Sequence, residues 1–306
     1  MDLKQLDYFV HVAELGSFSK AASLLSTAQS ALSHKVRQLE VELKQTLLHR
    51  NGRGVTPTEA GKRLLVHARG ILMQVARTHD QLAELGQSPS GHLSIGLPAT
   101  MGKLLTLPLV KAFRSGFPNA SIGIMEGLSA SIVEWVTTGR VDIGMVFNPA
   151  PSPAIEITPV HEEPMYLVSR LPARGARTLP LKELPNHPLI IPSRPNANRM
   201  RIEAQLAYFG LKPSIAFEVD GITSLLDMVE AGYGSAVLPI TSLRAYGLEK
   251  AFAARAIVSP RLLIQISLVV SSQRPTTPLS KQALDLIRRT AGQVFAAKPD
   301  ERAASR

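Results

Sequence analysis

A set of hydrogen-bonding side chains lies close together near the N-terminus, at spacings of three and four residues: Gln29, Ser30, Ser33, His34 and Arg37, with Thr27 just ahead of them. These spacings place the side chains on one face of a helix. The amide of Gln29 suits the N6 and N7 edge of adenine, and hydroxyl and guanidinium groups reach base edges or phosphates. The plainer alternative is a solvated helix face. The pattern predicts reading of a DNA major groove.

Three short helices must position these groups. Apolar residues at helical spacing predict a helix over residues 3–15. A second helix follows the break at Gly16, with Ser17 as its cap, and a third carries Leu32, Val36 and Leu39 on its apolar face. Two helices joined by a very short turn, the second with a polar outer face, form the helix-turn-helix pattern.

The charge of the chain points to a polyanionic partner. It has 306 residues, enough for two or three domains, and a formal net charge of +10. Residues 20–69 hold nine Lys or Arg and three acidic residues. Within this stretch, Asn51-Gly52-Arg53 favours a tight hairpin turn. The hairpin would place a basic wing, with Arg50 and Arg53, beside the third helix.

A long helix is predicted from Thr58 onward, because no proline appears before Pro89. Its apolar positions follow a heptad pattern: Leu64, Ala68, Ile71, Val75, Thr78, Leu82 and Leu85. This pattern indicates a dimerisation helix, and the alternative is a helix that packs on its own domain. A hinge over residues 86–91 is expected to follow.

The rest of the chain alternates short apolar strands with helices, which is typical of α/β domains. Strands are expected at 94–97, 122–125, 142–147, 166–168, 189–191, 216–219, 236–238 and 262–270. Helices are expected at 101–115, 129–138, 196–209, 222–231 and 279–295. The late strand and helix predict that the chain forms two lobes and crosses back to the first.

A ligand of a two-lobed α/β domain belongs in the crevice beyond the carboxyl ends of the strands, where helix N-termini offer free N–H groups. The residues at these places are candidates for effector binding: Pro98, Ala99, Thr100, Met101, Ser129, Phe147, Asn148, Ser193, Arg194 and Thr223. For each, a turn or helix cap is the plainer alternative. Arg194 and Arg199 would suit a carboxylate, so an anionic small molecule is the expected ligand.

The segments Ser17–Ala22 and Gln29–Ser33, followed by Leu39-Glu40, Arg50, Arg53, Thr56 and Ala60-Gly61, resemble the LysR-type bacterial transcription regulators. Weaker matches continue through residues 139–144, 229–234 and 238–239. The subgroup resembles the nitrogen-assimilation-control type. The resemblance implies a winged helix-turn-helix, a linker helix that dimerises and an effector domain like a two-lobed periplasmic binding protein. It also implies an effector-contacting hydroxyl at the loop that holds Thr100.

Together these inferences predict an α+β multidomain protein. Residues 1–57 form the DNA-binding domain, 58–90 the linker helix and hinge, and 91–306 the effector domain, with lobe I over 91–162 and 268–306 and lobe II over 163–267. The expected function is a ligand-responsive regulator that binds an inverted repeat as a homodimer or, as is common in the family, a homotetramer. RNA polymerase is a further candidate partner. The candidate DNA contacts are Ser17, Thr27, Gln29, Ser30, Ser33, His34, Arg37, Arg50 and Arg53.

Other classes are less consistent with the sequence. The chain has no cysteine and no pair of histidines at helical metal-ligand spacing, so no metal or other cofactor is expected. No apolar run suggests a signal peptide or a membrane helix, which predicts a cytoplasmic protein without a membrane partner. A solute-binding protein and an enzyme built on the two-lobed domain remain as alternatives. No catalytic set is evident, so the chain is not expected to be an enzyme.

Overall fold

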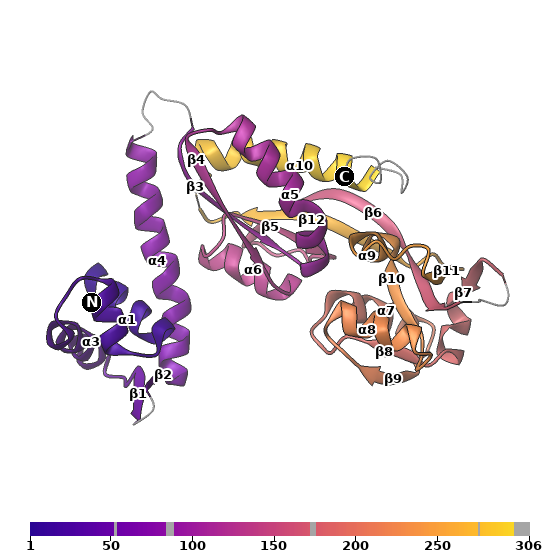
Figure 1. Ribbon diagram of the computed structural model, residues 1–306, viewed down its shortest axis with the longest axis horizontal. Helices are drawn as coiled ribbons and strands as arrows, with labels where there is room; N and C mark the ends of the chain where they lie inside the picture. The colour runs from indigo at the N-terminus through magenta and orange to yellow at the C-terminus, as the bar shows by residue number, and fades with distance from the viewer. Residues whose placement is uncertain (52–53, 84–88, 172–175, 275, 297–306) are drawn as a thin grey trace. The chain divides into compact units, whose positions relative to one another are not determined.

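The computed structural model describes residues 1–51, 54–83, 89–171, 176–274 and 276–296. The chain forms two compact units, one over residues 1–87 together with 138–140 and the other over the remaining residues. Helices and strands alternate in the larger unit, whereas the smaller unit is mainly helical (Figure 1).

Three helices form the centre of the N-terminal unit: α1 (Leu3–Leu15), α2 (Phe18–Leu24) and α3 (Gln29–Leu43). Asp2 caps α1 by accepting a hydrogen bond from the Gln5 N–H, at 2.7 Å. Gly16 ends α1 in the left-handed conformation, at φ +61°, which glycine adopts without strain. Ser17 then caps α2, as its place in the sequence predicts. The predicted helix-turn-helix is confirmed.

A single apolar core holds the three helices together. Most of the large side chains that are fully buried in it come from α1 and α3 and include Phe9, Val12, Leu32, Val36 and Leu39. These residues recur at spacings of three and four along each helix, so that one face of each helix is apolar. The opposite face of α3 is thereby turned to solvent.

The wing is a two-stranded antiparallel hairpin, β1 (Leu48–Asn51) and β2 (Gly54–Pro57), with Asn51 opposite Gly54. Glu40 of α3 anchors it, because its carboxylate accepts hydrogen bonds from the backbone N–H groups of Leu47 and Leu48, at 2.8 and 3.2 Å. The predicted hairpin is therefore confirmed, while Gly52 and Arg53 at its tip lie outside the described residues.

The long helix α4 (Glu59–Ala83) begins where Thr58 accepts a hydrogen bond from the Gly61 N–H, at 2.9 Å. Only glycine fits at position 61, since a Cβ there would lie 2.0 Å from the carbonyl oxygen of Leu47. An ion pair of 2.6 Å between Arg69 and Glu14 also links α4 to α1. Residues 84–88, which include the first half of the predicted hinge, lie outside the described residues.

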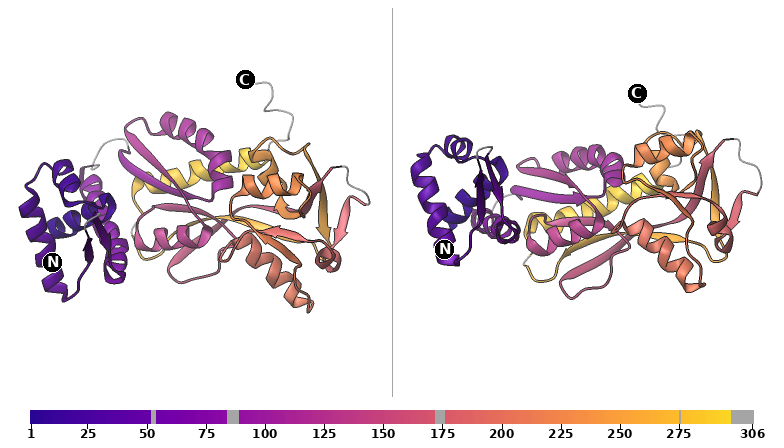
Figure 2. Two further views of the ribbon diagram at one scale, coloured as in Figure 1. Left: turned by 60° about the horizontal axis from the view of Figure 1, so that its bottom comes forward. Right: turned by 90° about the horizontal axis from the view of Figure 1, so that it is seen from below.

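Lobe I of the second unit begins with the predicted βαβαβ arrangement: β3 (Gly91–Leu97), α5 (Ala99–Gly116), β4 (Ala120–Glu126), α6 (Ser129–Thr138) and β5 (Ile143–Phe147). Strands β4, β3 and β5 are parallel neighbours. Strand β12 (Leu263–Ser271) joins them beside β5, and α10 (Pro278–Ala296) packs next to α5 (Figure 2). The predicted return of the chain to lobe I is confirmed.

Lobe II contains β7 (Thr178–Pro180), a 3-10 helix (Leu181–Asn186), β8 (Leu189–Ile191), α7 (Ala197–Tyr208), β9 (Ile215–Glu218), α8 (Ile222–Glu230), β10 (Ala236–Pro239), α9 (Ile240–Ala245) and β11 (Phe252–Val258). Strands β8 and β9 are parallel and are connected by α7. Strands β10 and β11 both pair with β6 (Ile155–Arg170), which runs antiparallel to them. One long strand therefore belongs to the sheets of both lobes.

The structure differs from the sequence prediction at the crossings between the lobes. The sequence predicts a short strand at 166–168, but β6 has 16 residues and pairs with β12 over residues 155–164. The return crossing also comes earlier than residue 268, because β12 pairs with Pro164 of β6 already at Leu263. The elements β7, β11 and α9 are additions to the predicted set.

Candidate DNA interface and effector cavity

The outer face of α3 carries the side chains that the sequence nominates for base reading. Gln29, Ser30, His34 and Arg37 are exposed, and Ser33 is half-buried. The start of α3 has no side-chain cap, since Ala28 stands at the cap position. No side chain among the described residues therefore caps the first backbone N–H groups of α3, and phosphates bind readily at such helix ends.

The two candidates outside α3 have structural roles as well. Ser17 accepts the hydrogen bond that caps α2, at 3.3 Å from Lys20 N. Thr27 is half-buried in the turn before α3, where its backbone N–H bonds to the Ala22 carbonyl at 3.0 Å. Each hydroxyl can still donate to a phosphate, but the fold requires the turn that these residues form.

Arg50 connects the wing to the reading helix. Its guanidinium carbon lies 4.4 Å from the centre of the Phe18 ring, and its Nη1 donates to Ser33 Oγ at 3.3 Å. A planar guanidinium can stack and donate at the same time, which an ammonium group cannot do. Arg50 thus holds β1 against α2 and α3 while its side chain remains exposed. Arg53, the other predicted wing contact, lies outside the described residues.

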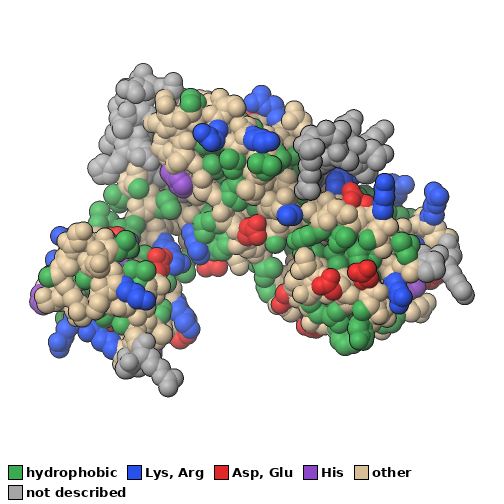
Figure 3. Space-filling view, viewed as in Figure 1, with side chains coloured by type: hydrophobic (Ala, Val, Ile, Leu, Met, Phe, Trp, Pro, Cys, Tyr) green, Lys and Arg blue, Asp and Glu red, His purple; other side chains and the backbone are tan. Residues whose placement is uncertain are grey.

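Basic residues surround this surface. Lys and Arg side chains line the lower margin of the N-terminal unit (Figure 3), as expected from the excess of basic residues between 20 and 69. Such a positive margin attracts the phosphates of a duplex and makes binding dependent on salt.

The predicted heptad positions of α4 divide into two groups. Ala68 is fully buried and Leu64 packs against the same core of the N-terminal unit, so these two positions hold α4 to its own domain. Further along, Ile71 is 38% exposed and Val75 is half-buried. The side chain of Leu82 and all of Leu85 lie outside the described residues. Among the described seam positions, Ile71 is the one with an exposed apolar side chain that could contact a partner.

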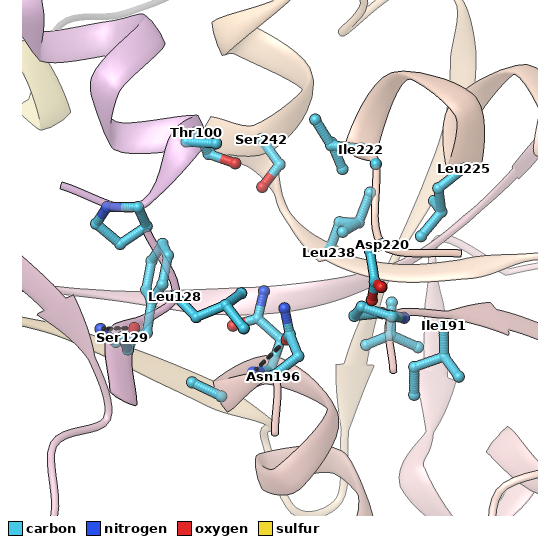
Figure 4. Close-up of a pocket in the computed structure, with 18 of the residues that line it drawn as sticks. Thr100, Leu128, Ser129, Ile191, Asn196, Asp220, Ile222, Leu225, Leu238 and Ser242 are labelled. Atoms are coloured by element: carbon cyan, nitrogen blue, oxygen red, sulfur yellow. Dashed lines mark hydrogen bonds between the residues drawn. The ribbon is translucent and has the colours of Figure 1, made fainter. Parts of the chain in front are cut away.

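A cavity of 510 Å³ lies in the second unit where the strand ends of the two lobes meet (Figure 4). The N-terminal turns of α5 and α6 border it from lobe I, and those of α7 and α8 border it from lobe II. This is the crevice at the carboxyl ends of the strands, where ligands of open α/β sheets bind. We call it the inter-lobe cavity.

Six of the predicted effector residues line the inter-lobe cavity: Pro98, Ala99, Thr100, Ser129, Phe147 and Thr223. Ser129 is held in place, because its Oγ accepts a hydrogen bond from the Phe147 N–H at 3.1 Å. Thr100 and Ser242 present their hydroxyl groups to the same part of the cavity (Figure 4).

Four predicted effector residues do not line the cavity. Met101 points into the core and is fully buried. Asn148 stabilises a left-handed turn, in which its Oδ1 accepts from the Gln265 N–H at 2.9 Å. Ser193 supports a lining residue, since its N–H and Oγ–H both donate to Asp220. Arg194 forms an ion pair of 2.8 Å with Glu203.

The expectation that Arg194 and Arg199 present guanidinium groups to a ligand is wrong. Arg199 is buried and forms ion pairs of 2.9 Å with Glu203 and 2.8 Å with Glu218. Burial opposes ionisation of Glu203, but Arg199 and Arg194 together hold the pKa of its carboxyl below its usual range. The two arginines are thus committed to neighbouring carboxylates, and an anionic ligand loses its predicted counter-charge.

Sequence reasoning missed several lining residues that the structure brings together: Glu126, Gly127, Leu128, Asn196, Asn198 and Asp220. The sequence could have indicated Glu126, Gly127 and Leu128, because they directly follow the predicted strand 122–125. Pro98 was selected for the same reason, as it follows the predicted strand 94–97. Asn196 could have been found as a helix cap, because its Oδ1 accepts from the N–H groups of Asn198 and Arg199. Asp220 follows β9 in the same manner.

The described residues hold no group of three or more His, Asp or Glu side chains that could bind a metal ion. Within the same part of the chain, no helix combines the length and the apolar character that a membrane crossing requires.

Comparison with known families covers both units. The model described as "Bacterial regulatory helix-turn-helix protein, lysR family" matches residues 3–62, and the "LysR substrate binding domain" model matches residues 86–292. The chain is 32% identical over 289 residues to the nitrogen assimilation regulatory protein nac of Klebsiella aerogenes, with 94% of each chain covered. It is 31% identical over 242 residues to the HTH-type transcriptional regulator CzcR of Bacillus anthracis, which covers 78% of this chain and 80% of that protein.

Solved structures share the fold over nearly the whole chain. CbnR, a LysR family transcriptional regulator, is 26% identical with a TM-score of 0.70, covering 95% of this chain and 99% of that one. CbnR complexed with its target DNA is 25% identical with a TM-score of 0.68, covering 95% and 100%. A full-length OxyR variant from Pseudomonas aeruginosa, at 20% identity and a TM-score of 0.72 over 98% and 96%, shows the same fold.

Proposed function

The chain belongs to the LysR family of DNA-binding transcriptional regulators, and from that premise we propose that it binds an inverted-repeat promoter site and responds there to a small molecule in the inter-lobe cavity. The observation that carries the proposal is the exposed polar face of α3 beside the basic wing, in a chain whose second unit has an open cavity. A regulator, not an enzyme or a solute-binding protein, combines these two features, and the relatives are regulators along almost their full length.

We propose that residues 1–57 bind DNA, 58–90 link and dimerise, and 91–306 bind the effector. Base edges would be contacted from the exposed face of α3, by Gln29, Ser30, Ser33, His34 and Arg37. Ser17, Thr27, Arg50 and Arg53 would contact the phosphate backbone or the minor groove. The solved complex of CbnR with its target DNA supports this use of the domain in a relative.

A homodimer, or a homotetramer built from dimers, would present two reading helices to the two half-sites of an inverted repeat. The exposed apolar side chain of Ile71 on α4 supports self-association through this helix. RNA polymerase is a further partner of such a regulator at a promoter. The regulator would act in the cytoplasm.

The effector would lie between the lobes, in contact with Thr100, Ser129 and Thr223. A ligand that touches both lobes favours one arrangement of them and thereby biases the DNA-binding state. The four helix N-termini at the cavity would attract an anionic group, whereas the carboxylates of Glu126 and Asp220 in its lining oppose one.

A mobility-shift assay with the DNA upstream of the protein's own gene tests the proposal, with a shuffled duplex of equal length and composition as the control. We expect tighter binding to the upstream duplex and a steep loss of affinity with added salt, because bound Lys and Arg release counterions from phosphates. Equal binding to both duplexes at moderate salt would contradict specific recognition of this region.

A further inference from the structure

We propose that the effector of this regulator carries a protonated amine on a largely apolar body, and that the carboxylate of Asp220 binds the amine. This inference rests on the proposed function, in which the inter-lobe cavity is the effector site. It replaces the anionic ligand that the sequence suggested.

The charge of the lining is the first observation. Among the described residues, the cavity is lined by two carboxylates, Glu126 and Asp220, and by no Lys or Arg. The nearby Arg194 and Arg199 already form ion pairs with Glu203. An anionic ligand would therefore approach two negative groups without a positive side chain to compensate, and like charges at short range disfavour binding.

One helix N-terminus at the cavity already has a carboxylate of the protein beside it. Glu126 lies against the first turn of α5, where a Cβ built on Gly102 would be 2.2 Å from Glu126 Oε1. The positive end of a helix dipole acts only within the first turn. The negative charge of Glu126 therefore lies near the positive end of α5, which makes this helix end less favourable for an anionic ligand.

Asp220 is arranged to accept a hydrogen bond from a cation. Both groups of Ser193 donate to one oxygen, the N–H at 2.8 Å and the Oγ–H at 2.5 Å from Asp220 Oδ1. These two bonds hold the pKa of the Asp220 carboxyl below its usual range, so the group is ionised at neutral pH. No donor among the described residues bonds to Oδ2, which leaves this oxygen for a ligand.

The rest of the cavity supports the same class of ligand. Asn198 Oδ1 is buried without a hydrogen-bond donor among the described residues, and an amine N–H could supply one. The lining of the cavity also includes the apolar side chains of Ile191, Ile222 and Leu225 (Figure 4). An ammonium group would form an ion pair with Asp220, and an apolar body would pack against these apolar side chains.

Calorimetry on the full-length protein tests the proposal with three probes that share one apolar body: 4-phenylbutylamine, 4-phenylbutan-1-ol and 4-phenylbutanoate. A hydrogen bond to a charged group predicts that the amine binds about tenfold more tightly than the alcohol, and the acid more weakly than either. Asp220→Asn keeps an oxygen for the Ser193 bonds but removes the charge, so it should abolish the preference for the amine. Asp227→Asn, an exposed change on α8 outside the cavity, should keep it.

Two results would overturn the amine proposal: equal or weaker binding of the amine relative to the other probes, or an amine preference that survives Asp220→Asn. Absence of binding by all three probes would also overturn it. A second variant, Ile222→Trp, fills the cavity and tests whether the cavity is the ligand site, independently of whether the ligand is an amine. If the alcohol binds the unaltered protein but not Ile222→Trp, the cavity remains the ligand site even where the amine preference fails. Probes that bind Ile222→Trp unchanged would show that the site lies elsewhere.

Discussion

Base discrimination by α3 depends on a few exposed side chains near its N-terminus. Gln29 is exposed, and Ser33 is half-buried and already accepts a hydrogen bond from Arg50. A hydroxyl held in this way keeps its own hydrogen for a base acceptor. The fold therefore orients Ser33 in advance, and Gln29 is held more loosely, because its Oε1 accepts a hydrogen bond of 3.4 Å from Ser19 Oγ.

We predict that Gln29→Ala or Ser33→Ala weakens binding to the best DNA site by about 1 to 3 kcal/mol, since each removes one base contact. Binding to random DNA should change little. Gln38→Ala, a similar change at an exposed position further along α3, is the control and should leave both affinities unchanged. Competition assays with specific and random duplexes measure the effect. An equal loss on both duplexes would place these side chains on the phosphate backbone.

A buried carboxylate in β6 makes the stability of the second unit depend on pH. Glu163 is only 4% exposed, and burial raises the pKa of its carboxyl although a hydrogen bond from Thr241 and the charge of Arg244 oppose the shift. The folded protein then keeps the proton at pH values where the unfolded chain has lost it. This stabilisation is complete below the usual glutamate pKa and is lost as the pH rises through the raised pKa.

Glu163→Gln imitates the protonated carboxyl at all pH values. We expect it to raise the free energy of unfolding at pH 8 and to change it little at pH 4.5, because only the ionised carboxylate pays the desolvation cost. Urea unfolding at the two pH values measures the difference. Glu156→Gln, an exposed change on the same strand, should show no such pH dependence. A loss of stability at pH 8 would mean that ion pairing of Glu163 outweighs its desolvation.

At the scale of elements, local signals determine where most helices and strands lie. The bounds of α1, α6 and β8 agree with those expected from apolar spacing and capping residues. Strand β6 is not predictable as one element, because Pro159 and Pro164 look like strand breakers. The structure accommodates them with a register shift against β12 between Ile266 and Ser267 and with Pro164 near the end of that pairing.

The loops that line the candidate site were predictable from the sequence, but the charge of the site was not. The rule that ligands bind beyond the carboxyl ends of strands selected the loops of Thr100, Ser129 and Thr223, and these three residues line the inter-lobe cavity. The pairing of Arg199 with Glu203 was open to sequence reasoning, because the two residues are four apart on one helix. The pairing of Arg199 with Glu218 was not, since it joins separate elements and depends on packing that no local pattern encodes. The charge of the cavity therefore became visible only in the structure.

The end of α3 contains a conformational strain that one substitution should relieve. Lys44 ends the helix in the left-handed conformation, at φ +51°, and its N–H and that of Gln45 bond back to the last turn. Residues with a Cβ are strained there, and glycine is the usual residue at this position.

We predict that Lys44→Gly stabilises the N-terminal unit by about 1 kcal/mol. Hydrogen exchange of the α3 amides, which reports local and global opening, measures the gain. Val41→Gly, at an exposed helical position one turn earlier, should instead destabilise the unit by a few tenths of a kcal/mol. Faster exchange in Lys44→Gly would show that the side chain contributes more than its backbone strain costs.

At the scale of the whole molecule, self-association should depend on the second half of α4. Ile71 is the exposed apolar position in the described part of the predicted seam, and burying an unpaired charge there is costly. We predict that Ile71→Asp dissociates the dimer at micromolar concentration in sedimentation. Ala76→Asp, at an exposed position on another face of α4, should remain dimeric. A wild-type monomer, or an Ile71→Asp dimer, would contradict association through this helix.

The response to the effector should be a coupling between two separate sites. A ligand changes the DNA-bound state only by its different affinity for the two arrangements of the protein, typically about 1 to 3 kcal/mol, or roughly 5- to 150-fold. If the ligand changes the affinity for DNA by a given factor, bound DNA must change the affinity for the ligand by the same factor.

We therefore predict that Thr100→Trp, which fills the inter-lobe cavity, abolishes the response to a bound effector and leaves the affinity for the strongest DNA site within about threefold of wild type. The reading helix belongs to the other unit and keeps its side chains. Fluorescence anisotropy with labelled operator DNA, with and without an effector found by thermal-shift screening, measures both quantities. Leu107→Trp, on the same helix but exposed and outside the cavity, should respond normally. A full response in Thr100→Trp would place the effector at another site, and a response lost equally in both variants would indicate general damage to lobe I.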